Sequence, residues 1–163
     1  MELLQFSKIN TLDYYAYLNL GFRMTAAAGS DFPWGSTIGE VRTFVYTGKE
    51  FTADTWFNGL KAGHTFVTNG PTLFLEADHQ LPGTEIIKTK GSATHLSVKA
   101  ASHPGIGNIT RVAIYNNDGL VIEKLNPENL NSLTINLSHK LDKSQWLTAV
   151  VYCGPVLDRK SVV

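Results

Sequence analysis

The acidic residue Asp31 is the strongest candidate for chemistry in this sequence. It follows the small-residue run 23–28 and the pair Gly29-Ser30, and it precedes the turn-forming string 32–35. The run is typical of a short buried strand. Open α/β folds and barrels place metal-binding and catalytic groups just past the carboxyl ends of such strands. Asp31 is therefore a candidate metal ligand, and the alternative is an aspartate that only shapes a turn.

Arg42 is a second candidate. It lies in the run 41–46, whose β-branched and aromatic residues predict a strand. Its guanidinium group could bind an anionic substrate or pair with an acidic side chain such as Asp31. The structural alternative for a single arginine is a supporting salt bridge.

Histidine, cysteine and tryptophan give weaker signals. No two histidines have the His-x-His or His-x3-His spacing that a metal site on one strand or helix would use. Cys153 ends an apolar run without a basic neighbour, so we interpret it as a structural thiol. Trp34, between Pro33 and Gly35, is the tryptophan that we expect to be exposed. The histidines are interpreted as scattered surface or strand-edge residues: His64, His79, His95, His103 and His139.

The amino-terminal part of the chain, 1–63, mixes helical and strand patterns. Apolar residues at helical spacing from Leu12 predict a helix, and Gly21 is placed to end it. A clearer helix is predicted over 52–62, since Thr52 can cap its start and Gly63 its end. So few elements cannot enclose a core. We therefore expect this segment to pack on the rest of the chain, on a second copy or on further polypeptide.

The hydrophobic period changes to two after Gly63, as expected for strands. The string 116–119, Asn-Asn-Asp-Gly, predicts a hairpin turn. This pattern predicts a mainly β fold, with an immunoglobulin-like β-sandwich domain over 64–163 after an incomplete α/β segment over 1–63. The predicted strands are 64–68, 73–77, 85–88, 95–100, 110–115, 120–125, 133–138 and 147–152.

The composition excludes several classes of protein. The chain has 163 residues, of which 43% are hydrophobic, enough to build a core. Its 14 basic and 14 acidic residues balance, which argues against nucleic acid or an anionic membrane as a partner. The single cysteine excludes an internal disulfide framework. With no apolar run near the roughly 20 residues of a membrane span and no basic leader, we expect a soluble protein without a signal peptide.

Six strings recur in a definite order: LNLGFR at 18–23, AGSD at 28–31, GEVRTFV at 39–45, WFNGLKAGHTFVTNGP at 56–71, WLTA at 146–149 and GPV at 154–156. Together they resemble the carboxyl-terminal part of the CehA/McbA-type metallohydrolases, which carry a PHP (polymerase and histidinol phosphatase) domain. The resemblance spans nearly the whole chain. It implies that 1–63 corresponds to the end of a distorted α/β barrel, followed by an appended sandwich.

The resemblance also implies a chemistry. Members of the family hold divalent metal ions (Zn, Mn or Fe) and hydrolyse phosphoester, ester or carbamate bonds, and Asp31 matches one of their metal ligands. A histidine often stands two residues later in the family, where this chain has Pro33. The family's His-x-His motif and its other ligands come before the matched region. We therefore expect this chain to be inactive by itself, with no metal bound.

Two expectations about partners and function follow. The first is that an upstream PHP barrel segment, or a second copy of the chain, completes the structure of a metal-dependent hydrolase. The alternative is a non-enzymatic β-sandwich that serves as a binding or interaction module.

Overall fold

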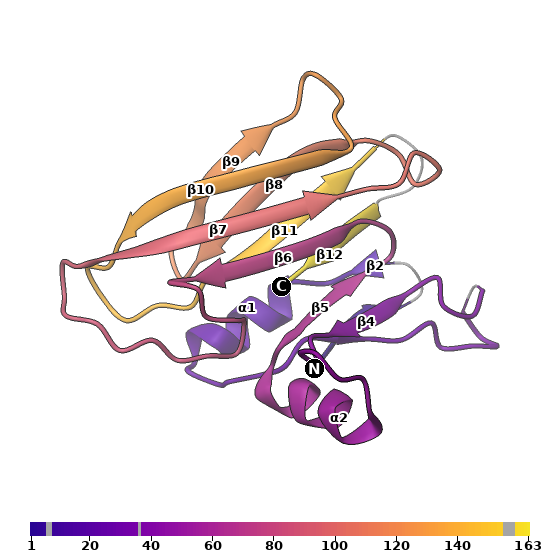
Figure 1. Cartoon of the computed structure of the whole chain (residues 1–163), viewed down its shortest axis with the longest axis horizontal. Coiled ribbons are helices and arrows are strands. Elements are labelled where there is room, and N and C mark those ends of the chain that lie inside the picture. The colour runs from indigo at the N-terminus through magenta and orange to yellow at the C-terminus, as the bar shows by residue number, and fades with distance from the viewer. Residues whose placement is uncertain (6–7, 36, 155–158) are drawn as a thin grey trace.

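The structure is a computed structural model that describes residues 1–5, 8–35, 37–154 and 159–163. Strands dominate this part of the chain, which confirms the prediction of a mainly β fold (Figure 1). The helices are α1 (Leu12–Asn19) and α2 (Ala53–Ala62). The strands are β1 (Glu2–Gln5), β2 (Lys8–Ile9), β3 (Ala27–Ala28), β4 (Arg42–Val45), β5 (Thr65–Thr68), β6 (Thr72–Ala77), β7 (Ala93–Ala101), β8 (Ile109–Asn116), β9 (Gly119–Leu125), β10 (Ser132–Lys140), β11 (Thr148–Cys153) and β12 (Arg159–Val162).

The strands form three sheets: a six-stranded sheet, called the large sheet, a three-stranded outer sheet of long strands, and a three-stranded small sheet of short strands. The outer sheet has the order β10-β7-β6, and the large sheet has the order β4-β5-β12-β11-β8-β9. The small sheet has the order β2-β1-β3, in which β1 and β3 run parallel. In Figure 1 the outer sheet lies in front of the large sheet, as expected for the two layers of a β-sandwich.

The main core fills the space between the outer and the large sheet. Strict alternation in β7 buries Leu96, Val98 and Ala100 on one face and leaves the residues between them on the other. These side chains meet Val112 and Val151 from the large sheet. The predicted alternation is therefore confirmed. The other buried members of this core are Phe66, Leu73, Leu75, Ile109, Ile114, Leu133, Ile135, Ala149, Cys153 and Val163.

A second core lies on the opposite face of the large sheet. The small sheet and α1 pack there, through Leu3, Tyr14 and Ala26. They meet three valines of the large sheet: Val67, Val150 and Val162. Of the three alternatives expected for the amino-terminal segment, the structure shows the first, packing on the rest of the chain.

The large sheet takes strands from both sides of residue 63. Edge strand β4 pairs with β5 in antiparallel register, from Arg42 opposite Thr68 to Val45 opposite Thr65. β3 is bonded to β4 through the side chain of Thr43, whose Oγ1 accepts a hydrogen bond from the Ala28 N–H at 2.7 Å. The small sheet and the large sheet are thus linked at the strand that leads to Asp31.

Helix α2 confirms the prediction made from its capping residues. The Thr52 hydroxyl accepts a hydrogen bond from the Thr55 N–H at 3.1 Å, and Gly63 ends the helix at a φ of 78°. A Cβ added at the buried Gly59 would lie 2.7 Å from the Tyr46 carbonyl oxygen. The helix backbone therefore lies directly against the end of β4.

The predicted strand 85–88 is wrong, since 84–89 are irregular. The Ile87 side chain is 90% exposed, so it does not pack on a core as a residue of a half-buried strand would. The segment is held instead by polar contacts, with Arg23 Nη2 at 2.6 Å from Glu85 Oε2 and Lys88 Nζ at 2.6 Å from Asp78 Oδ2. The prediction failed because two isoleucines give a strand-like composition without supplying a partner strand.

Candidate functional site

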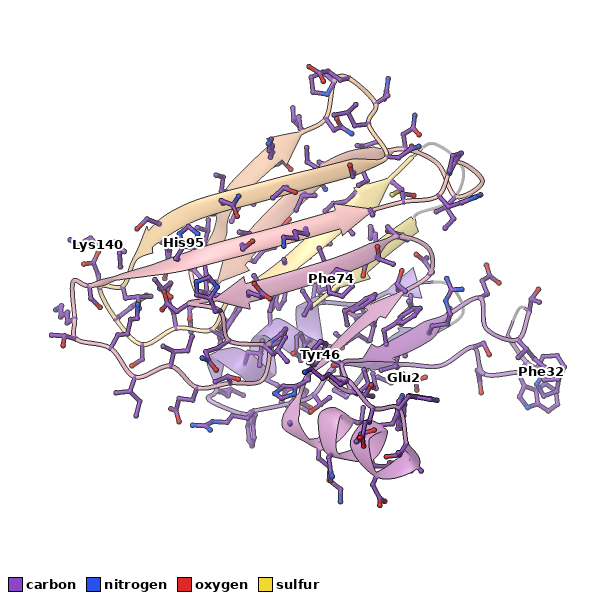
Figure 2. All side chains as sticks on the ribbon, viewed as in Figure 1. Glu2, Phe32, Tyr46, Phe74, His95 and Lys140 are labelled. Atoms are coloured by element: carbon purple, nitrogen blue, oxygen red, sulfur yellow. The ribbon has the colours of Figure 1, made fainter. Side chains whose placement is uncertain are left out.

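Asp31 lies three residues beyond β3, at the base of a projecting loop. Its backbone is in the left-handed region with a φ of 51°, and its carbonyl accepts a hydrogen bond from the Gly35 N–H at 2.7 Å. The side chain is exposed, as are the apolar side chains of the loop, including Trp34 at 83%. Figure 2 shows Phe32 at the end of this loop, far from the rest of the molecule. The prediction that Trp34 is exposed is confirmed.

The strand before Asp31 has the surroundings of a parallel α/β unit. β1 and β3 are adjacent and parallel, and α1 lies between them in the sequence. Asp31 therefore follows the carboxyl end of a parallel strand, which is the position used for functional groups in α/β folds. A residue not singled out from the sequence, Glu2, lies against Gly29, since its Oε1 would lie 2.7 Å from a Cβ added there. Glu2 was missed because β1 was not predicted.

Acidic and histidine side chains do not gather around Asp31 in the ranges given above. Among these residues, no group of three or more His, Cys, Asp or Glu side chains could hold a metal ion. A hydrolytic metal centre uses three or more protein ligands. The assignment of Asp31 as a metal ligand therefore remains a prediction.

Arg42 lies on the edge strand β4 with its side chain exposed. Its guanidinium carbon is 5.8 Å from the centre of the Phe44 ring. No ion pair joins it to Asp31 in the part of the chain that the structure describes. Its charge is therefore presented to solvent above an aromatic ring, and a role in substrate binding stays a prediction.

Cys153, His103 and His139 each have local surroundings of their own. Cys153 is buried, and burial raises the pKa of its thiol, so the thiolate needed of a nucleophile is disfavoured. His139 lies 2.9 Å from the Gln145 side-chain nitrogen, and His103 Nδ1 accepts a hydrogen bond from the Gly105 N–H. The burial of Cys153 fits its interpretation as a structural thiol.

A polar hollow that the sequence did not suggest lies on the solvent face of the outer sheet. It has a volume of about 530 Å³ and adjoins a smaller hollow of about 280 Å³ that includes Phe74. Figure 2 shows Phe74 on β6 and His95 on β7, on the face turned to the viewer. The larger hollow is lined by Glu76, His79, His95, Ser97, Lys99 and Asn136.

A tight turn at the end of β6 carries one of the histidines to this hollow. Asp78 and His79 both have a left-handed backbone, with φ angles of 48° and 63°. The Asp78 carboxylate accepts hydrogen bonds from the Thr94 hydroxyl at 2.7 Å and the His95 N–H at 2.9 Å. These bonds connect the turn to β7, and so place His79 on the same side of the sheet as His95.

The exchange Asp78→Asn tests this anchor through its pH dependence. The His95 N–H, then Lys88 and Thr94, hold the pKa of Asp78 well below its usual range. A carboxylate whose pKa is lower in the folded than in the unfolded chain stabilises the fold at neutral pH. This contribution is lost as the pH falls below about 4, where the unfolded chain takes up the proton first. We expect Asp78→Asn to lower the urea midpoint at pH 7 and to flatten its decline between about pH 4 and pH 2.

A matched control for this exchange is Asp142→Asn. Asp142 forms a surface ion pair with Lys140 at 3.1 Å, and both side chains are largely exposed, so its removal should leave the urea midpoint unchanged. Equal midpoints for the two variants across the acid range would contradict the role given to Asp78.

Comparison with protein-family models, with curated proteins and with solved structures found no match for this chain. Within the described ranges, neither helix has the length and apolar character needed to cross a membrane.

Proposed function

We propose that this chain supplies Asp31 and a β-sandwich to a PHP-type metal-dependent hydrolase of phosphoester, ester or carbamate bonds, and that it is inactive by itself. The observation that carries the proposal is the position of Asp31, exposed just past β3, which is parallel to β1. This is where an α/β barrel presents a metal ligand. The ordered strings that resemble the CehA/McbA-type enzymes support the same assignment.

The proposed partner is a barrel segment that brings the remaining metal ligands, or a second copy of this chain. Large apolar side chains are exposed on the loop after Asp31, on β4 and the residue after it, and on or just before α2. Exposed apolar groups of this size can mark a surface that another polypeptide covers. These residues are Phe32, Trp34, Ile38, Phe44, Tyr46, Phe51 and Phe57.

The proposal assigns distinct tasks to the two candidate residues. A divalent ion, bound with the partner's ligands, would supply an activated water. The Asp31 carboxylate would hold that ion, and its exposure leaves the oxygens open to a ligand from another segment. The exposed guanidinium of Arg42 would bind an anionic substrate such as a phosphoester.

Calorimetric titration with Zn²⁺ and Mn²⁺ tests the incompleteness of the site. We expect no binding of micromolar affinity by this chain, because the Asp31 carboxylate alone provides too few ligands. The chain should bind either metal tightly once it is joined to, or mixed with, a segment that carries a His-x-His strand. Asp31→Asn should weaken that binding at least about tenfold, whereas Asp54→Asn on α2 should not.

Two results would contradict the proposal. One is tight binding of Zn²⁺ or Mn²⁺ by this chain alone. The other is the absence of any His-x-His segment in the reading frame upstream of its gene and in neighbouring genes.

A second function, a non-enzymatic binding module, is favoured by a separate observation. The polar hollow on the outer sheet lies on a face that belongs wholly to the sandwich. A ligand could therefore bind there whether or not Asp31 belongs to a metal site.

A further inference from the structure

The solvent face of the outer sheet arranges polar side chains in rows. Register places Glu76, Ser97 and Asn136 side by side across β6, β7 and β10. The next row on the same face contains Phe74, Lys99 and Thr134. Directly opposed side chains in such rows lie about 5 Å apart, so one ligand can contact several of them.

The polar groups of the hollow are available to a ligand. Glu76, Ser97, Lys99 and Asn136 make no side-chain hydrogen bond or ion pair with any residue in the described ranges. Glu76 and Ser97 are half-buried and line the hollow. Carboxylate, hydroxyl, amide and ammonium groups together offer both donors and acceptors.

Phe74 adds an apolar platform beside these groups. Its ring is 55% exposed and makes an edge contact with the buried Phe66, at 5.6 Å between ring centres. Phe66 is in turn stacked on Phe44 at 4.9 Å. The ring therefore rests against buried aromatic side chains, while more than half of the residue's surface stays open to the apolar surface of a ligand.

The charges of the hollow favour an uncharged ligand. Glu76 and Lys99 carry opposite charges on adjacent rows, so their formal sum is zero. A strongly anionic ligand would meet Glu76, and a strongly cationic one would meet Lys99. Dense donors and acceptors beside an exposed aromatic ring fit a molecule with many hydroxyl groups and apolar C–H faces.

We propose that the solvent face of the outer sheet binds a neutral oligosaccharide, with a sugar ring stacked on Phe74 and its hydroxyl groups on Glu76, Ser97 and Asn136. The two hollows adjoin along the sheet, which gives room for more than one sugar unit. His79 and His95 border the far end of the larger hollow. This inference does not depend on the proposed hydrolase function.

NMR titration of the ¹⁵N-labelled chain tests the proposal. The probes are neutral hexasaccharides of glucose, xylose, mannose and N-acetylglucosamine, with a heparin hexasaccharide and a hexaglutamate peptide as anionic comparisons. We expect at least one neutral probe to give saturable shifts confined to amides of β6, β7 and β10. Phe74→Ala and Asn136→Ala should each weaken binding of that probe about tenfold.

Phe57→Ala is the matched control. Phe57 is also 55% exposed, but it lies on α2, so its loss should leave sugar binding unchanged. Because Phe74, Phe57 and Asn136 are all exposed, the three variants should keep the melting temperature of the parent chain. The proposal is overturned if no neutral probe gives saturable shifts, if an anionic probe binds the same face as tightly, or if Phe57→Ala weakens binding as much as Phe74→Ala.

Discussion

The exchange Gly83→Ala is expected to lower the free energy of unfolding by about 3–5 kcal/mol. Gly83 has a φ of +84°, in the left-handed region that costs other residues about 1–2 kcal/mol. A Cβ at this position would also lie 2.0 Å from the Ala62 carbonyl oxygen and 2.8 Å from the Gly63 Cα. Both are backbone atoms at the end of α2, so the helix end would have to move.

The exchange Gly91→Ala separates the cost of the left-handed backbone from the cost of the steric clash. Gly91 has the same φ of +84°, but a Cβ there would have nothing within 4 Å. It should therefore lose only about 1–2 kcal/mol. Urea unfolding followed by circular dichroism measures both variants. Equal losses for Gly83→Ala and Gly91→Ala would show that the contact between the 83 loop and α2 is not tight.

The exchange Leu3→Ala is expected to cost about 2–5 kcal/mol of unfolding free energy. Leu3 is 2% exposed, and it packs in the second core with Val150 and Val162. Its removal should leave a cavity between the small sheet and the large sheet. If these layers form one cooperative unit, the whole chain should unfold at a lower urea concentration and in one transition.

Tryptophan fluorescence provides an independent probe at this junction. Trp146, just before β11, is stacked on Tyr15 of α1 at 4.8 Å between ring centres. In a chain whose Trp34 and Trp56 are replaced by phenylalanine, the signal of Trp146 should change together with the circular dichroism signal. Leu12→Ala is the control, since Leu12 is 79% exposed and its loss should change stability by less than about 0.5 kcal/mol. Separate transitions for the two signals, or equal effects of the two exchanges, would contradict the single unit.

Patterns within one element allowed its structure to be predicted. In β7, alternation predicted that Leu96 and Val98 lie on one face, which also puts Ser97 and Lys99 on the other. In α2, Thr52 and Gly63 marked both ends. Such predictions succeed because helix capping and side-chain alternation depend on residues only a few positions apart.

Partners distant in the sequence were not predictable in the same way. β12 pairs with both β11 and β5, and nothing in its own four residues indicates either neighbour. Ile86 and Ile87 have the composition of a strand, yet no strand among the described residues pairs with them. Strand pairing depends on which distant segments fold together, and the composition of one segment does not determine its pairing partner.

The candidate sites differ in the same respect. The sequence alone singled out Asp31, because the residues that mark its position, a small-residue run and a Gly-Ser pair, are its immediate neighbours. The association of Glu76, Ser97 and Asn136 was decided only by tertiary structure, since these residues come from three strands. The physical reason is that the register of β6, β7 and β10 is determined by the shared core beneath them, and that register sets which exposed side chains meet.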